Sequence, residues 1–117
     1  MWVAGPGALL VAKVHKIAER VDQRDRLRDK DALDVLRLLR AVDTRDLASR
    51  LRLLVAEELT AASTAEALGL LPRLFSDERS EGVAMAVRAA GDAEEPATIA
   101  ASLVALVTDL RDALDAG

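Results

Sequence analysis

Two charged residues, Lys13 and Asp31, stand where two amphipathic helices should turn apolar side chains toward a core. In the segment AKVHKIAERVDQRDRLRDKDALDVLRLL (12–39), Lys13 falls about 60° from the centre of the first apolar arc. Asp31 falls at a comparable angle on the second arc, and Asp34 points farther toward solvent. A lysine holds a phosphate as a point charge, and a neighbouring carboxylate assists a metal or a nucleophile. The spacing therefore allows a cleft for phosphate chemistry, lined by Lys13 with Asp31 or Asp34.

The same charges also fit an ordinary helix surface. Lys13 would extend along the edge of the apolar arc with its ammonium in water, where Lys13→Met is neutral. Asp31 would favour the positive end of its helix. In an antiparallel hairpin Asp31 comes opposite Arg20, an ion pair of at most about 1 kcal/mol. Lys13 would then lie roughly 10 Å away along the helix axis.

The chain lacks the other parts of common catalytic sites. It has no cysteine and one histidine, His15, which excludes thiolate and multi-histidine metal sites. His15 is expected to be exposed by its position on the helical wheel, with no Ser–His–Asp set around it. It has no Gly-rich phosphate loop, because AGPG (4–7) follows no strand. The one Asp-x-Asp spacing, DKD (29–31), falls at a helix start. We therefore expect no metal site and no cofactor for this chain alone.

The elements that must position these residues are helical throughout. Apolar residues recur at intervals of three and four. The first helix opens at Pro6, and the segment 22–29 is expected to form the turn before a second helix over 30–41. Asp43 is expected to cap a third helix, whose inner stripe runs from Leu47 to Leu59. No strand pattern competes with these helices.

Later helix boundaries follow from capping residues, prolines and glycines. Ser63 with Glu66 has the spacing of a capping box and predicts the start of a fourth helix. Gly69 and Pro72 are expected to interrupt it. A fifth helix is expected to begin at Ser80 and Glu81 and to stop at Gly91, and Pro96 should open the last.

Composition defines the fold class. The 117 residues are 51% hydrophobic, but Trp2 and Phe75 are the only aromatics, so the core must be built from Leu, Val and Ala. Such a core favours close helix packing, and the length fits one domain. We predict an all-α, compact bundle of five to six helices in a single domain, 1–117.

The same composition favours a cytoplasmic protein. The longest apolar run, PATIAASLVALVT (96–108), is 13 residues, short of the roughly 20 that cross a membrane. The N-terminal segment has no basic region ahead of its apolar stretch, as a signal peptide would require. We therefore expect no membrane association.

Charge is unevenly distributed along the chain. The net charge is −4, with 12 basic and 8 acidic residues in 1–52 (+4), and 4 basic and 12 acidic residues in 53–117 (−8). This asymmetry fits either a solvated face or a surface for an anion or an acidic partner. Four arginines of the first half are candidates for contacting phosphate or nucleic acid, although no aromatic residue is interleaved for base stacking: Arg20, Arg24, Arg26 and Arg28.

The run GALLVAKVHKIAER…RLRDKDALDVLRLLRA resembles a known family over about residues 7–42. It is similar to the C-terminal half of nucleotidyltransferase-type proteins of the abortive-infection toxin family (AbiEii-like), in the polymerase-β-like superfamily. LLVAKVHKI matches a helix of that family through Lys13. KDALDVLRLL matches the following helix through Asp31 or Asp34, because the D-x-x-D register leaves both open.

The resemblance implies a composite nucleotide site with Lys13, Asp31 and Asp34 in catalytic roles. The family's catalytic half carries a Gly-Ser element and paired strand carboxylates for Mg²⁺ and a nucleoside triphosphate, and this chain has neither motif. It therefore looks like a non-catalytic helical domain that completes such a site only beside a catalytic domain. The alternative is a helical interaction module without a nucleotide role, which buries an apolar patch against a partner or in a homodimer.

Overall fold

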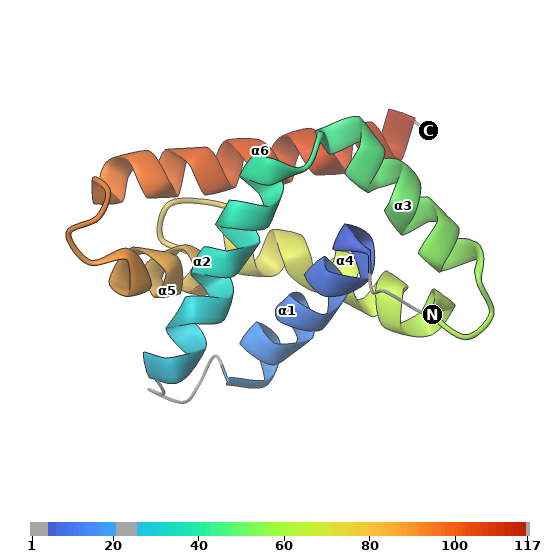
Figure 1. The fold of residues 1–117 in the computed structure, drawn as a ribbon, viewed down its shortest axis with the longest axis horizontal. Coiled ribbons are helices and arrows are strands. Elements are labelled where there is room, and N and C mark those ends of the chain that lie inside the picture. Colours follow the sequence, from blue (N-terminus) through green and yellow to red (C-terminus); the bar gives the residue numbers. More distant parts are fainter. Residues whose placement is uncertain (1–4, 21–25, 117) are drawn as a thin grey trace.

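The computed structural model describes residues 5–20 and 26–116, which form six α-helices and no strand. In chain order the helices are α1 (Pro6–Arg20), α2 (Arg26–Ala41), α3 (Thr44–Ala56), α4 (Ala61–Phe75), α5 (Glu81–Ala90) and α6 (Pro96–Ala116) (Figure 1). The predicted all-α class is confirmed. The Cα radius of gyration is 13.6 Å, close to the value of about 13 Å for a compact domain of roughly this length.

The helices pack around one aliphatic core. α2 packs chiefly on α5 and on α1, while α3 packs on α6 and α1 packs on α4 (Figure 1). The largest fully buried side chains come from every helix except α5, and Phe75 is the one aromatic among them. α5 contributes smaller or more flexible side chains: Val83, Met85 and Ala86. Because aromatic residues are scarce, leucine, valine and isoleucine side chains fill the core and interdigitate between the helices.

Several predicted helix boundaries are confirmed. Pro6 opens α1 and Pro96 opens α6, where a missing N–H breaks no helical hydrogen bond. Asp43 caps α3, because its carboxylate accepts the Asp46 N–H at 3.1 Å. α5 begins after Ser80 and ends at Gly91, whose φ of +56° is the left-handed conformation that glycine adopts without strain.

Three boundary predictions are wrong. The expected turn 22–29 is too long, because α2 already begins at Arg26. The fourth helix begins at Ala61, one residue after Thr60, rather than at Ser63. It also continues through Pro72 to Phe75, although an interior proline costs about 3 kcal/mol. Its buried face explains the continuation, since Leu71, Leu74 and Phe75 pack into the core on either side of the proline.

The inner stripe of the third helix ends earlier than predicted. Leu47 and Leu51 are fully buried, but α3 stops at Ala56 and Leu59 lies in the following turn with 94% of its surface exposed. Val55 is also exposed, at 41%. The turn is fastened instead by Thr60, whose hydroxyl donates to the Leu54 carbonyl at 2.6 Å. The end of α3 therefore projects beyond the core.

Candidate functional site

Lys13, Asp31 and Asp34 form one cluster between α1 and α2. The Lys13 Nζ donates to Asp31 Oδ1 at 2.8 Å and to Asp34 Oδ2 at 3.1 Å. The three side chains are partly buried, with exposed fractions of 20%, 11% and 26%. The interpretation of Lys13 as a surface residue two turns from Asp31 is therefore wrong. The structure brings together all three residues that the resemblance places in catalytic roles.

Helix geometry explains how the cluster forms. Asp31 and Asp34 are three residues apart in α2, so their side chains lie on the same face one above the other. Lys13 lies at the edge of the buried face of α1, next to the fully buried Ile17. A lysine stem can cover apolar surface while its ammonium reaches past it. Here the ammonium reaches across to α2 and bridges the two carboxylates.

The cluster is held electrostatically. The hydrogen bond that Lys13 donates to Asp31 is the main cause that raises the pKa of Lys13 above its ordinary value of 10.5, and the bond that it donates to Asp34 adds to this effect. Burial acts in the opposite direction, but does not outweigh these bonds. Arg37, one turn along α2, adds a longer contact to Asp34 at 3.4 Å. Lys13 is thus a fixed cation at neutral pH.

The cluster is not a Mg²⁺ site by itself. Both carboxylates already accept hydrogen bonds from the Lys13 ammonium, whereas Mg²⁺ needs free oxygen ligands around an octahedron. Across 5–20 and 26–116 there is no group of three or more acidic or histidine residues that could hold a metal ion. Lys13 with two carboxylates can orient or neutralise a charged group, and it needs further ligands from elsewhere to hold a metal.

The predicted arginine contacts fall largely outside what is described. Arg24 lies outside the described residues, as do the side chains of Arg20, Arg26 and Arg28. The expected Arg20–Asp31 pair is likewise outside them. Nucleic-acid or phosphate binding through these arginines therefore stays a prediction.

A second buried carboxylate was missed by the sequence reasoning. Asp29 is only 5% exposed, and it accepts a two-pronged bond from Arg88 of α5, with Nε and Nη2 each 3.0 Å from a carboxylate oxygen. The pair ties α2 to α5. A signal was present, because Asp29 continues the spacing of Ala32, Leu33 and Leu36 on the buried face of α2. Because Asp29 falls within the turn expected over 22–29, it is not predicted to lie on the buried face of a helix.

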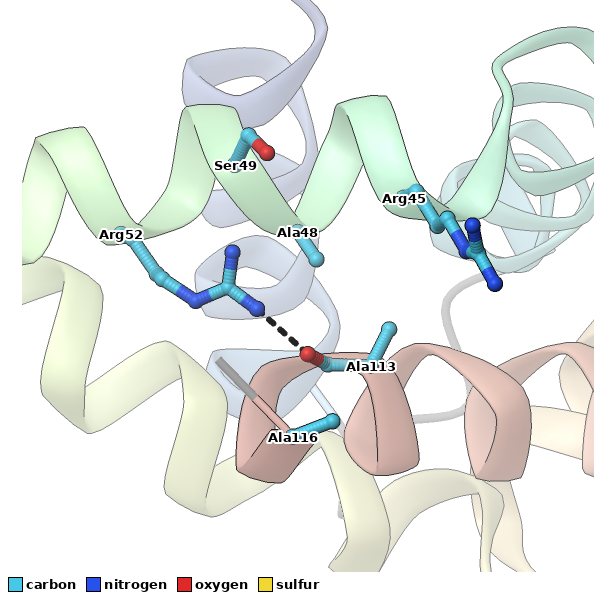
Figure 2. A pocket seen from close by; sticks show the side chains of 6 residues that line it. All are labelled: Arg45, Ala48, Ser49, Arg52, Ala113 and Ala116. Atoms are coloured by element: carbon cyan, nitrogen blue, oxygen red, sulfur yellow. Dashed lines mark hydrogen bonds between the residues drawn. The ribbon is translucent and has the colours of Figure 1, made fainter.

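A pocket of about 330 Å³ opens between α3 and the last turns of α6. Figure 2 shows Arg45 and Arg52 extending from α3 on either side of Ala48, with Ala113 and Ala116 of α6 facing them. Ser49 completes the lining. An Arg52 Nη2 donates to the Ala113 carbonyl at 2.5 Å, so this arginine also covers the C-terminal end of α6.

A second pocket of about 330 Å³ is mostly apolar and lies between α1, the end of α3 and the start of α4. Ala8, Val11, Ala12 and Leu54 line it, and Leu59 stands at it with 94% exposure. Its polar edge is made by His15, whose Nε2 is 2.9 Å from the Ser63 carbonyl. We call this second pocket the apolar groove.

Comparison with protein-family models, with curated proteins and with solved structures finds no match to this chain. What the fold and site define is therefore a class: an all-α protein of six described helices with a partly buried Lys–Asp–Asp cluster. In the described ranges, no helix is both long and apolar enough to span a bilayer.

Proposed function

We propose that this chain is a non-catalytic helical domain of a nucleotidyltransferase-like protein. In this proposal, Lys13, Asp31 and Asp34 face a separate catalytic domain, and the nucleotide site is complete only when the two are together. The observation that carries the proposal is the bridged cluster itself. Lys13, which matches one helical motif of the family, bridges Asp31 and Asp34 of the next motif, and all three side chains are partly accessible. Among the described residues they belong to no group of three or more residues that could hold a metal ion.

The exposed face of α1 supports docking of a partner beside the cluster. Leu9, Ala12 and Lys16 are exposed and lie on one face by their spacing of three and four residues. On the helical wheel Lys13 borders this face on one side, and the groove-lining Ala8 borders it on the other. A domain seated on α1 would therefore cover the apolar groove and approach the charged cluster together.

A transfer assay tests this proposal. The chain alone, incubated with labelled nucleoside triphosphates, Mg²⁺ and RNA, should transfer no nucleotide. Adding a polymerase-β-like catalytic domain encoded immediately upstream should produce transfer, and Lys13→Met should lower the rate. Lys30→Met, at an exposed position of α2 outside the face of α1, should lower it less. Robust transfer by this chain alone would overturn the proposal. So would a catalytic domain whose rate is the same with and without the chain.

A second candidate function is favoured by the apolar surface. Among the described residues, four large apolar side chains are exposed, and three of them lie within seven positions at the end of α3: Leu9, Leu53, Val55 and Leu59. A helical module that associates with itself or with another protein would bury such side chains without any nucleotide role. Association that increases with concentration, in the absence of a catalytic domain, would distinguish this interaction module from the nucleotidyltransferase-like domain.

A further inference from the structure

The pocket between α3 and α6 is cationic, and no acidic residue lines it. Arg45, Ser49 and Arg52 are spaced by four and three residues, so they lie along one face of α3. The remaining lining is alanine: Ala48, Ala113 and Ala116. Two guanidinium groups and a hydroxyl thus supply the hydrogen-bond donors, and the Ala113 carbonyl, which accepts from Arg52, supplies an acceptor.

Arg52 is incompletely paired. It donates to one neutral carbonyl, that of Ala113. Its Nε is buried and has no hydrogen-bond partner within the described part of the chain. A partly buried guanidinium is ordinarily matched by a carboxylate or another anion, because withdrawing the charge from water is costly. The carbonyl at the end of α6 offers only the partial charge of a helix terminus.

Arg45 differs from three arginines that form ion pairs with described residues. Arg40 bonds to Glu94 at 2.6 Å, Arg50 bonds to Asp46 at 3.1 Å, and Arg88 bonds to Asp29 at 3.0 Å. Arg45 has no ion pair to any described residue, although its side chain is exposed and lines the pocket. Its long side chain is therefore free to turn toward an anion that enters.

We propose that this pocket binds a phosphate group, held between the Arg45 and Arg52 guanidinium groups. A tetrahedral anion directs oxygens toward donors on several sides, whereas a single carboxylate offers two oxygens in one plane. The cavity volume of about 330 Å³ also leaves room for more than a free phosphate ion, near the lower end of small-molecule sites. The site uses α3 and α6, and so does not depend on the proposed role of Lys13.

Titration of the isotopically labelled chain with inorganic phosphate, at constant ionic strength, tests the proposal by nuclear magnetic resonance. We expect saturable shifts at Arg45, Ser49, Arg52 and Ala113, with a dissociation constant of about 1 mM or tighter. Arg45→Gln should weaken binding about tenfold, as expected when one charge-assisted hydrogen-bonding group is lost. Arg73→Gln, an exposed arginine on α4, is the charge-matched control and should leave binding unchanged.

Further titrations identify the source of the phosphate group, and a second variant controls for a folding defect. Arg52→Lys keeps the charge but loses the guanidinium group, so it should still weaken phosphate binding. Circular dichroism checks that this variant is folded. Adenosine monophosphate binding more tightly than inorganic phosphate indicates a nucleotide source, and equal affinities indicate the free anion. No saturable shift with phosphate would overturn the proposal. Equal weakening by Arg45→Gln and Arg73→Gln, or acetate binding as tightly as phosphate, would also overturn it.

Discussion

Lys13 shows why a chain rich in apolar residues places charges beside its core. The residue sits at the edge of the buried face of α1, and its ammonium spans the gap to Asp31 and Asp34 on α2. A lysine stem fills apolar space there, while the two carboxylates satisfy the charge. The charges therefore belong to one bridged group that joins two helices.

Replacing Lys13 should reveal that bridge in the free energy of unfolding. Lys13→Met would leave two partly buried carboxylates, 11% and 26% exposed, side by side without their shared cation. We expect a loss of about 1–3 kcal/mol, between the values for an exposed pair and for a buried one. Urea melts measure it.

The matched control for that substitution is Lys16→Met, because Lys16 is an exposed lysine one turn further along α1. It should change stability by less than about 0.5 kcal/mol. Equal and small effects of the two substitutions would mean that the Lys13 bridge contributes nothing to folding. A loss confined to Lys13→Met would confirm it.

Alkaline pH should weaken the same bridge. Since the pKa of Lys13 in the folded chain is raised above its ordinary 10.5, its stabilising contribution is fully present below that pH. The contribution is lost as the pH rises through the raised value. Melts from neutral pH to above pH 10.5 should show a fall in the stability of the wild-type chain. The fall should be smaller in Lys13→Met and as large as in the wild type in Lys16→Met. An identical alkaline profile for Lys13→Met would contradict this.

At the scale of elements, the sequence identifies the helices better than their ends. Pro6, Asp43, Gly91 and Pro96 mark boundaries by local backbone chemistry, and the structure agrees at each. Pro72 misleads, because the burial of its neighbours outweighs its local penalty. Boundaries set by capping are therefore predictable from one segment, while those set by packing depend on distant residues.

The residues of the site are predictable from the sequence, but the contacts between them are not. The periodicity places Lys13 and Asp31 beside their apolar arcs and Asp34 farther toward solvent, and so it indicates a cleft shared by Lys13 with Asp31 or Asp34. The contact of Lys13 with Asp31 depends on how α1 and α2 are aligned along their axes, which the pattern of each helix alone does not specify. The Asp29–Arg88 pair joins residues 59 positions apart, and no local pattern specifies such a partner.

Two glycines should respond in opposite ways to the same substitution. Gly69 is exposed within α4, and a Cβ added there meets nothing within 4 Å. Gly69→Ala should therefore stabilise the chain by about 0.5–1 kcal/mol, by restricting the unfolded state and favouring helix. A Cβ at Gly82 would lie 2.6 Å from Phe75 Cε1 and 2.7 Å from the Leu74 carbonyl oxygen.

Gly82→Ala should therefore destabilise the chain by about 1–3 kcal/mol, as overpacking does. Thermal melts of both variants check the pair. A destabilising Gly69→Ala would mean that α4 is distorted at this position, and a neutral Gly82→Ala would mean that α5 can shift away from Phe75.

At the scale of the whole molecule, folding brings opposite charges together across the two halves of the sequence. Arg40 of the basic half bonds to Glu94 of the acidic half, with contacts of 2.9 and 2.6 Å. Asp29 and Arg88 make the reverse pairing. Part of the charge asymmetry between the two halves is therefore neutralised by ion pairs within the fold. The apolar surface at the end of α3 has no such internal partner among the described residues.

Self-association should depend on that surface. If the chain is an interaction module that pairs with itself, sedimentation should show a weight-average mass that rises with concentration. Leu59→Glu should abolish the rise, and at concentrations where both chains are monomeric it should leave the melting temperature unchanged, because Leu59 is 94% exposed. Ala105→Glu adds the same charge at an exposed position of α6 and should leave association intact.

A wild-type chain that stays monomeric at high concentration would remove self-association from the candidate functions. Loss of association in both variants would attribute the effect to net charge instead of the apolar surface at the end of α3.

The clamp between Asp29 and Arg88 has a consequence for the order in which the chain folds. Its two residues are 59 positions apart, so the bond forms only after a long loop has closed, at an entropic cost that grows with loop length. We expect the clamp to be absent from the transition state, where the local α1–α2 hairpin can already be present. Arg88→Met should then speed unfolding while the refolding rate stays nearly constant. Stopped-flow refolding and unfolding in urea measure the two rates, and a slowed refolding arm would place the clamp in the folding nucleus.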